Sequence, residues 1–213
     1  MHHVLLKELQ WIPITLARRV RVMTESQIAQ GWYGGNLRKT RRALEVLQAE
    51  ELLSSFTDLV LEPLTFSFPL VSWTPYQGKA PNFSEVAYEG KKRFSGKPSR
   101  QKIFYATRTA INRFAGSAPG KPTQTNALNH DIGVSSLYLH FLSTEPSKAR
   151  RFVGEDEWKE MGHCGHKQCV PDAVIRHRRD YRKNIMIELA GQYAPERLQH
   201  WHEQYQGFHY QIW

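Results

Sequence analysis

The amino-terminal part of the chain has hydrophobic positions at helical spacing. Thr24, with Gln27 three residues later, has the form of a capping box and predicts a short helix that ends at Gly31. A second helix is expected to start near Asn36, because apolar positions then recur at steps of three and four residues. The predicted buried face of that helix consists of Leu37, Thr40, Ala43, Leu44 and Leu47. Two helices in succession are therefore predicted here.

The middle of the chain carries strong loop signals. Four prolines between residues 62 and 82 do not suit a regular helix or a central strand, and they predict a connector that packs through its aromatic residues. Residues 90–101 are basic and contain glycine and proline, which is typical of a loop, either solvated or lying along a phosphate backbone. Residues 103–116 predict a short strand and an amphipathic helix, and residues 116–125 predict a flexible break.

The carboxy-terminal half has a clearer pattern. Residues 126–142 are apolar on more than one helical face, which predicts a buried helix. Residues 173–178 and 183–189 predict two strands joined by a charged turn. Residues 194–205 have helical spacing of apolar positions, and a last strand is expected at residues 208–213. The predicted order of the core elements is strand, strand, helix, strand.

Composition and charge limit the classes of protein that fit. The chain has 213 residues and a mass of 24.8 kDa, which suits an ordinary domain with a smaller second one. The formal charge of +9 and the pI near 9.6 favour an acidic partner, with nucleic acid first and an anionic membrane surface as the competitor. We find no apolar run long enough for a membrane span and no signal-peptide features in Met1–Gln10. A cytoplasmic protein is expected, and Cys164 and Cys169 suit a reducing compartment.

Basic residues crowd the first two turns of the second predicted helix. These residues are Arg38, Lys39, Arg41 and Arg42. The helix dipole disfavours cations at this end, so local helix stability does not explain them, whereas an external anionic partner does. With strand-like runs at residues 52–56 and 59–61, the pattern resembles a winged helix-turn-helix, whose second helix enters the major groove of double-stranded DNA. The four residues are predicted DNA contacts, and the alternative is a solvated charged face.

Two carboxylates stand at the ends of two neighbouring predicted strands. Asp172 begins the first strand and Glu188 closes the second, so pairing of the strands would bring both side chains to one edge. Paired carboxylates supply the oxygen ligands that Mg²⁺ takes, with water completing the shell. Such an ion would polarise a phosphate and help to generate an attacking hydroxide. Glu157 is the candidate third ligand, although an acidic helical turn more often faces solvent.

A cluster of histidine and cysteine invites a second metal interpretation. Its members are His163, Cys164, His166 and Cys169, all of residue types that bind zinc. Four ligands within seven residues would need an unusually tight turn, because zinc sites normally draw ligand pairs from separated segments. We therefore expect no zinc site. His130, near the start of the predicted buried helix, is more typical of a structural histidine than of a catalytic one.

These residues together resemble a known family. Pro171 and Asp172, followed by Glu188 on the next strand, resemble the PD-(D/E)xK restriction-endonuclease-like nucleases. More narrowly, the chain resembles the replication-relaxation family of plasmid and mobile-element proteins. Besides the start that resembles a winged helix, the segments that carry this resemblance are FYATRTAINRFAG, NHDIGVSSLYLHFL, PDAV and IELAGQYAPERL.

The resemblance implies an α/β (α+β) fold with a DNA-binding role. A winged helix-turn-helix is implied at residues 1–62, a connector at 63–100, and a restriction-endonuclease-like domain on a mixed sheet at 101–213. The implied role is replication, relaxation or mobilisation of plasmid or mobile-element DNA. The implied partners are double-stranded DNA and either a second copy of the chain, as a homodimer, or other replication and mobilisation proteins.

One departure from the nuclease pattern bears on activity. The pattern has a lysine two residues beyond Glu188, where this chain has Ala190. That lysine would stabilise the charge that develops on phosphate, and Gln192 or Arg197 is the candidate substitute. Three functions stay open: a DNA-binding protein with a degenerate nuclease-like domain, a magnesium-dependent endonuclease that nicks DNA, and a transcriptional regulator with a closed apolar ligand pocket.

Overall fold

The computed structural model describes residues 9–76, 78–122, 125–163 and 168–213. Within them the chain forms an α+β fold with two β-sheets, which confirms the predicted fold class. Two expectations fall wholly or partly outside the described residues: the missing signal peptide in Met1–Gln10, and the zinc interpretation through Cys164 and His166. In the described parts of the chain, no helix has both the length and the apolar character to cross a membrane.

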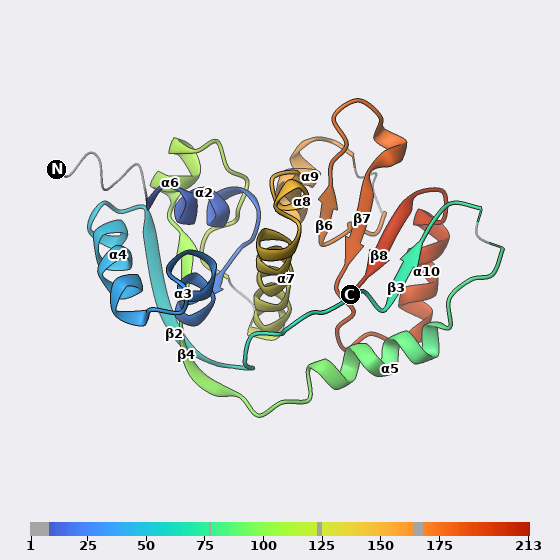
Figure 1. The fold of residues 1–213 in the computed structure, drawn as a ribbon, viewed down its shortest axis with the longest axis horizontal. Coiled ribbons are helices and arrows are strands. Elements are labelled where there is room, and N and C mark those ends of the chain that lie inside the picture. Colours follow the sequence, from blue (N-terminus) through green and yellow to red (C-terminus); the bar gives the residue numbers. More distant parts are fainter. Residues whose placement is uncertain (1–8, 77, 123–124, 164–167) are drawn as a thin grey trace.

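The first sheet is antiparallel and has the strand order β1-β4-β2. Its strands are β1 (Met23–Thr24), β2 (Leu53–Val60) and β4 (Ser99–Ala106). The helices around it are α2 (Trp11–Arg18), α3 (Glu25–Tyr33), α4 (Leu37–Ala49) and α6 (Arg108–Arg113). Figure 1 shows this part on the left, with α4 at the outer edge.

The second sheet is mixed and has the strand order β3-β8-β7-β6-β5. Its strands are β3 (Val71–Trp73), β5 (Phe152–Gly154), β6 (Ala173–Ile175), β7 (Ile185–Glu188) and β8 (His209–Ile212). The other elements here are α5 (Phe83–Arg93), α8 (Pro146–Ala149), α9 (Glu155–Glu160), η1 (Tyr181–Lys183) and α10 (Pro195–Tyr205). Strands β7 and β8 are parallel and joined through α10, so the predicted order of strand, strand, helix and strand is confirmed.

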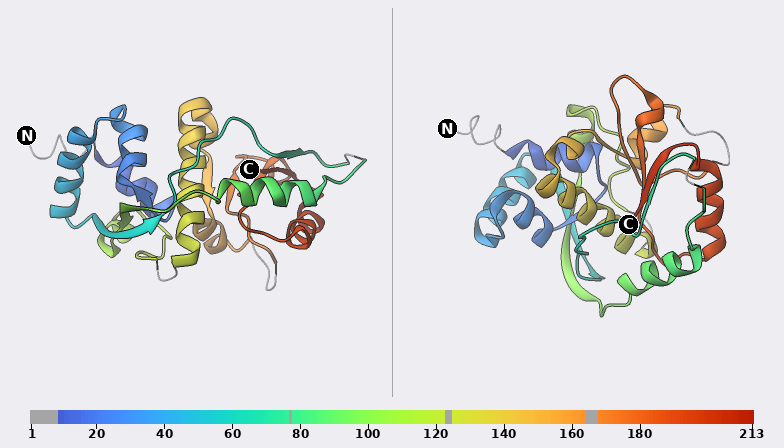
Figure 2. Two further views of the ribbon diagram at one scale, coloured as in Figure 1. Left: turned by 90° about the horizontal axis from the view of Figure 1, so that it is seen from below. Right: turned by 45° about the vertical axis from the view of Figure 1, so that its right-hand side comes forward.

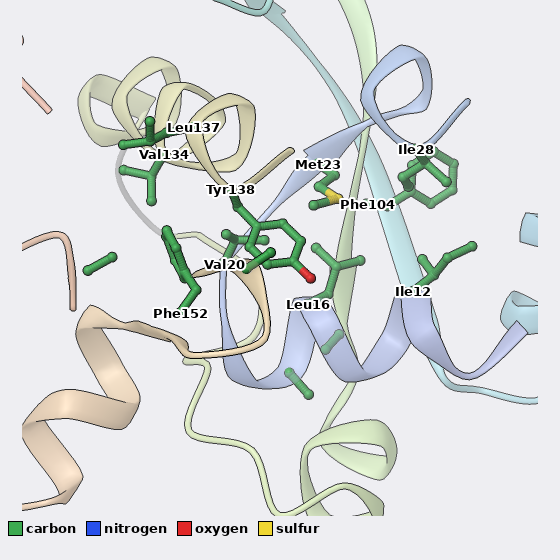
Figure 3. Packing of buried hydrophobic residues seen from close by; sticks show 14 of the residues in the cluster. Ile12, Leu16, Val20, Met23, Ile28, Phe104, Val134, Leu137, Tyr138 and Phe152 are labelled. Carbon is green, nitrogen blue, oxygen red and sulfur yellow. The ribbon is translucent and has the colours of Figure 1, made fainter. Parts of the chain in front are cut away.

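Helix α7 (Thr125–Thr144) lies between the two sheets, as the views in Figures 1 and 2 agree. One hydrophobic core contains buried residues of α2, α3, α4 and β4 together with residues of α7, β5 and β7. Figure 3 shows Tyr138 of α7 beside Val20 and Phe152, with the Tyr138 and Phe152 rings 5.3 Å apart. Each such side chain contributes about 1.5–3 kcal/mol when buried. The sheets therefore share one core, and α7 fixes their relative position.

The capping box at the start of α3 forms as predicted. The Gln27 N–H donates to the Thr24 hydroxyl, and the Thr24 N–H donates to the Gln27 side chain. The helix does not end at Gly31, as the sequence suggested, but at Gly34, which has a left-handed φ of 57°. Gly31 serves close packing instead, because a Cβ there would lie 2.7 Å from Leu139 Cδ2 of α7.

Helix α4 begins at the predicted place, directly after Asn36, whose side chain accepts a hydrogen bond from the Lys39 N–H. The predicted inner face is buried at Thr40, Ala43, Leu44 and Leu47. Leu37 is the exception and is 41% exposed, because it stands in the first turn, beyond the edge of the core. The two short strands predicted next are wrong in detail, since residues 53–60 form one continuous strand, β2.

The predicted connector is an insertion between two paired strands. Strands β2 and β4 pair from Leu53 opposite Ala106 to Val60 opposite Ser99. Residues 101–106 therefore lie in the first sheet, although the family resemblance implies a place for them in the second domain. Between the two strands the chain crosses to the second sheet and supplies β3 and α5. The basic loop predicted at residues 90–101 is instead the end of α5, a short link and the start of β4.

Candidate functional site

The four predicted DNA contacts lie on the exposed side of α4. Arg38, Lys39, Arg41 and Arg42 are all exposed. Arg41 also has a structural role, because its guanidinium donates to both carboxylate oxygens of Glu25 in α3, at 2.9 and 3.1 Å. Among the described residues, Arg38, Lys39 and Arg42 have no carboxylate partner. The start of α4 therefore presents a cationic surface on which, among the described residues, a carboxylate pairs with Arg41 alone.

The two predicted carboxylates lie close together in the second sheet, where β6 begins and β7 ends. Strands β6 and β7 pair so that Ala173 lies opposite Ile187. Asp172 precedes β6 directly and Glu188 ends β7, so the two residues are neighbours across the strands. Asp172 Oδ2 accepts a hydrogen bond from the Leu189 N–H at 2.7 Å. The structure thus brings these two predicted residues together.

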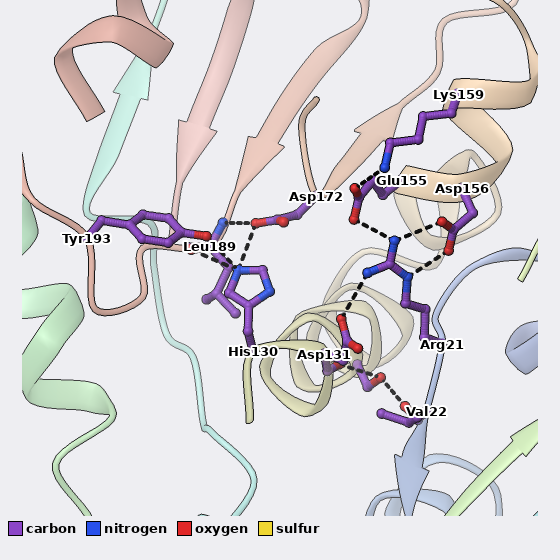
Figure 4. Close-up of polar contacts among 11 residues, drawn as sticks. Arg21, Val22, His130, Asp131, Glu155, Asp156, Lys159, Asp172, Leu189 and Tyr193 are labelled. Carbon is purple, nitrogen blue, oxygen red and sulfur yellow. Dashed lines mark hydrogen bonds and ion pairs between the residues drawn. The ribbon is translucent and has the colours of Figure 1, made fainter. Parts of the chain in front are cut away.

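His130 of α7 reaches this edge from the other side (Figure 4). Its Nε2 lies 3.2 Å from Asp172 Oδ2, 3.1 Å from the Tyr193 hydroxyl oxygen and 3.3 Å from the Leu189 carbonyl oxygen. An imidazolium N–H at Nε2 would donate to these oxygens. His130 therefore occupies the side of the Asp172 carboxylate that faces α7. A structural role for His130 stays a prediction.

Arg21 joins the two parts of the molecule through three carboxylates. Its guanidinium makes a two-point contact with Asp156, at 2.7 and 2.8 Å. It also lies 2.9 Å from Glu155 Oε2 and 3.4 Å from Asp131 Oδ1. Figure 4 shows that Arg21 approaches from the chain between α2 and β1, while its partners belong to α7 and α9. An acidic helical turn was expected to face solvent. Instead, Glu155 and Asp156 of α9 bind Arg21 and so connect α9 to the amino-terminal part of the chain.

Burial and charge shift the pKa values of several groups in this region. Burial first, and the charge of Asp172 second, raise the pKa of Glu188 well above its usual value and favour its neutral form. Burial opposes the charge on His130, but Asp172 and Asp131 outweigh it and raise the pKa of His130 to about 9. Burial raises the pKa of Asp131 to about 6, although Arg21 and His130 act in the opposite direction.

These groups line a cleft of about 740 Å³. Asp172, Glu188, Gln192 and Arg197 all line it, so the four predicted catalytic positions share one cavity. The Arg197 guanidinium stacks on the Tyr193 ring, 3.8 Å from its centroid, and its charge partly offsets the raised pKa of Glu188. The charged lining differs from the closed apolar pocket that a ligand-sensing regulator would need.

Ala190, at the position of the nuclease lysine, faces the protein interior. It is fully buried and belongs to the core between the second sheet, α5 and α10. A Cβ at Gly90 of α5 would lie 2.7 Å from Ala190 Cβ, so α5 is in direct contact with the segment that follows β7. A lysine at position 190 would collide with α5. The helix from the inserted segment thus fills the space that the lysine would need.

The described side chains do not fit a magnesium site as they are arranged. Glu157 turns away from Glu188 and pairs with Arg18 at 2.5 Å. The Leu189 N–H and His130 already occupy Asp172 Oδ2. Within the described ranges there is no group of three His, Cys, Asp or Glu side chains placed to hold an ion. Glu188 Oε2 is one of three buried side-chain atoms without a hydrogen-bond partner among the described residues, and the other two belong to Arg93 and Trp201. Magnesium therefore stays a prediction.

The described members of the histidine and cysteine cluster lie beside aromatic residues. The His163 ring is 4.3 Å from the Trp158 ring and 5.3 Å from the Tyr181 ring. The N–H of Cys169 donates to the Gln204 side chain at 2.7 Å. Cys164 and His166 lie outside the described residues, so the expectation of no zinc stays a prediction.

Comparison with known families decides the identity of the chain. The family model described as replication-relaxation matches residues 14–211. The chain belongs to the replication-relaxation family. A search of curated proteins found no match, and neither did a search of solved structures. Membership of the replication-relaxation family supports a role related to replication or relaxation. Both the basic surface of α4 and the carboxylate cleft lie within the matched residues.

Three residues of the cleft region were absent from the sequence predictions: Arg21, Asp131 and Tyr193. Asp131 directly follows His130 and is the one Asp, Glu, Lys or Arg residue in the α7 sequence, which was a usable signal. Arg21 gave no local signal, because its strongest partner, Asp156, lies 135 residues away. In this member of the replication-relaxation family, the cleft is thus built from distant segments.

Proposed function

We propose that the protein binds double-stranded DNA through α4, in the manner of a winged helix-turn-helix, during replication, relaxation or mobilisation of plasmid or mobile-element DNA. The observation that carries the proposal is the exposed basic start of α4. Arg38, Lys39 and Arg42 project from the first two turns without a carboxylate partner among the described residues. In such domains the amino-terminal residues of the second helix lie nearest the bases and phosphates.

The link between α3 and α4 supports this proposal. Gly34 and Gly35 both have left-handed φ values, 57° and 82°, which permit a tight turn between the two helices. A three-stranded sheet, β1-β4-β2, stands behind the helix pair, as in winged helix-turn-helix domains. The wing departs from the usual hairpin, because the segment between Val60 and Ser99 crosses to the second sheet.

The double replacement Arg38→Ala with Arg42→Ala is expected to weaken binding to duplex DNA about tenfold or more. The slope of log K against log salt, which is negative, should become less steep by about two units, because about one counterion is released per phosphate contact. These two residues are better probes than Arg41, whose loss would also break the contact with Glu25 and disturb the helix pair. Fluorescence anisotropy with a labelled duplex over a salt series measures both quantities.

A matched control is available on α5. Lys91 and Lys92 are exposed and remote from α4, so their replacement by alanine removes the same charge. This control should bind DNA nearly as the wild type does. Equal affinity and equal salt slope for the α4 variant and the wild type would refute DNA binding through α4.

For the second domain we favour a structural role of the cleft over DNA cleavage. The ion pair of His130 with Asp172 and the raised pKa of Glu188 weaken the negative charge that these two carboxylates can offer a metal ion. Ala190 and its contact with α5 leave no room for the usual lysine. These observations support a nuclease-like domain that no longer cleaves DNA and that packs against the DNA-binding part as a structural support.

Incubation of the protein with supercoiled plasmid and Mg²⁺ or Mn²⁺ is therefore expected to leave the plasmid supercoiled. Gel electrophoresis over a range of protein concentrations provides the measurement. Nicking by the wild type that disappears in both Asp172→Ala and Glu188→Ala would overturn this expectation and establish a metal-dependent endonuclease. Nicking that persists in both variants would come from a contaminating enzyme.

A further inference from the structure

A second basic surface is formed by segments other than α4. Six arginines line a groove of about 530 Å³ between the end of α2, the link from α8 to β5, and the end of β6. They are Arg18, Arg19, Arg150, Arg151, Arg176 and Arg178, and we call this surface the arginine groove. Figure 1 places α4 at the left edge of the molecule and β6 beyond α7, so the two basic surfaces are separate.

The arginine groove carries a large excess of positive charge. Glu157 is the acidic residue in its lining, and it pairs with Arg18. Within the described residues, no carboxylate forms an ion pair with Arg150, Arg176 or Arg178. These three side chains are also exposed. Carboxylates of the described residues therefore leave most of the positive charge of the groove without an ion pair.

The strand pairing forces two of these arginines together. Phe152 of β5 lies opposite Ile175 of β6, and one step further the Arg176 N–H donates to the Arg151 carbonyl at 2.9 Å. Like charges on residues directly opposite each other in neighbouring strands destabilise a sheet. Arg151 Nε donates to the Ser147 carbonyl at 3.1 Å, which gives this side chain a local partner but does not neutralise its charge. An anion bound between the two arginines would offset their repulsion.

Arg19 acts as a positioning residue for the groove. Its guanidinium donates to the carbonyl oxygens of Ala149, Arg150 and Phe152, and so holds the link between α8 and β5 in place. The contact is close, because a Cβ at Gly154 would lie 2.2 Å from the Arg19 carbonyl oxygen. Arg150 and Arg151 are therefore presented on a backbone that the end of α2 holds in place.

We propose that the arginine groove binds the phosphate backbone of a second segment of double-stranded DNA, separate from the segment at α4. Guanidinium groups suit phosphate because their planar donors match two phosphate oxygens at once. A recessed row of arginines suits a ridge of discrete phosphates better than the plane of an anionic membrane. With two separate basic surfaces, one molecule would hold two DNA segments together. The identity of the anion as DNA rests on the function proposed for α4.

The test compares three charge-altering variants in the full chain. The groove variant is Arg176→Glu with Arg178→Glu. Among the described residues, the Arg176 side chain contacts Met161 Sδ at 3.9 Å, and the Arg178 side chain has no hydrogen bond or ion pair. The control is Lys91→Glu with Lys92→Glu on α5, which makes the same change in charge. The third is Arg38→Ala with Arg42→Ala on α4. Circular dichroism and urea unfolding verify that each variant folds.

Two readouts are expected to change together in the groove variant. Affinity for duplex DNA, measured by anisotropy between about 50 and 200 mM salt, should fall about tenfold with a salt slope smaller by about two units. Capture of a labelled duplex by protein bound to an immobilised duplex should be lost in the groove variant and in the α4 variant, and kept in the control. The replacement of Arg176 and Arg178 by lysine should restore most of the binding, because the charge is kept.

Each other outcome would overturn the proposal. Wild-type affinity, salt slope and duplex capture in the groove variant would exclude a DNA surface there. An equal loss in the Lys91 and Lys92 control would assign the effect to total charge. Loss of binding to vesicles that contain phosphatidylserine, with DNA binding unchanged, would assign the groove to a membrane. Failure of the α4 proposal would give a different result. The α4 variant would then bind duplex DNA as the wild type does, while the groove variant would bind it more weakly.

Discussion

Replacing Arg21 with methionine is expected to lower the free energy of unfolding by about 2–4 kcal/mol at neutral pH. Arg21 is a partly buried cation among three carboxylates, and its side chain is 25% exposed. Methionine fills similar space but leaves Asp131, Glu155 and Asp156 without their shared counter-ion. The loss of one partner from a buried ion pair is costly because the remaining charge stays desolvated. Urea unfolding followed by tryptophan fluorescence measures the change.

The neighbouring Arg18 provides the matched control for this experiment. It pairs with Glu157, but its side chain is 43% exposed, so its replacement by methionine should cost no more than about 1 kcal/mol. Arg21→Lys should fall between the two, since it keeps the charge but loses the two-point contact with Asp156. A similarly small effect of Arg21→Met and Arg18→Met would show that the Arg21 cluster does not hold the two parts together.

The expected loss should also be smaller in acid. The carboxylates around Arg21 take up protons as the pH falls, and Asp131, with a pKa of about 6, does so first. Neutral carboxyl groups no longer need the guanidinium. The difference in unfolding free energy between the wild type and Arg21→Met should therefore decrease below pH 6. A difference that stays constant from neutral to acid pH would point to lost packing of the arginine stem instead.

The elements that could be predicted from the sequence are those whose causes are local. The capping box at Thr24 and the cap at Asn36 placed α3 and α4, because each cap bonds within its own first turn. The end of α3 could not be predicted. Gly31 looks like a helix stop, but its role depends on contact with Leu139, which is distant in sequence. The insertion between β2 and β4 could not be predicted for the same reason, because these paired strands are separated in sequence by residues 61–98.

The candidate sites divide in the same way. Asp172 and Glu188 could be brought together from the sequence, because consecutive antiparallel strands place their facing ends side by side. Their chemistry could not be predicted, because His130 and the Arg21 cluster come from distant segments. Ala190 was recognised as a departure from the nuclease pattern, yet its physical reason, the contact with Gly90 of α5, required the fold. The basic residues of α4 were predicted from local crowding, and the arginine groove was not, because three separate segments build it.

A rise in pH from about 6.5 to about 9 is expected to lower the free energy of unfolding by about 2–3 kcal/mol through His130. The folded protein holds the proton on His130 more tightly than the unfolded chain does, with a pKa of about 9 against 6.5. The stabilisation is therefore complete below 6.5 and is lost as the pH rises through 9. Asp172 and Asp131 supply the charges that favour the imidazolium, and Tyr193 and Glu188 also face this region.

Asp131 and Glu188 lower stability over other parts of the pH range. The pKa of Asp131 is about 6 in the folded protein against 3.8 in the unfolded chain, so its part of the unfolding free energy is lost as the pH rises from 3.8 to 6. This range lies below the range of pH 6.5 to 9 in which His130 acts. The pKa of Glu188 is raised from 4.5, so Glu188 lowers the unfolding free energy as the pH rises above 4.5. This decrease adds to the one caused by His130 at higher pH. The contribution of His130 must therefore be isolated by substitution.

His130→Gln isolates the histidine because glutamine places an amide nitrogen near the position of Nε2 without a titratable proton. In this variant the decrease between pH 6.5 and 9 should shrink by most of the expected 2–3 kcal/mol, with the part due to Glu188 left. His202→Asn is the control. Burial lowers the pKa of His202, so it affects stability only below its usual value of 6.5 and should leave the alkaline slope unchanged. Urea unfolding at intervals from pH 5 to 9.5 measures these slopes, and an alkaline slope that is the same in His130→Gln and in the wild type would mean that His130 is not held as a cation beside Asp172.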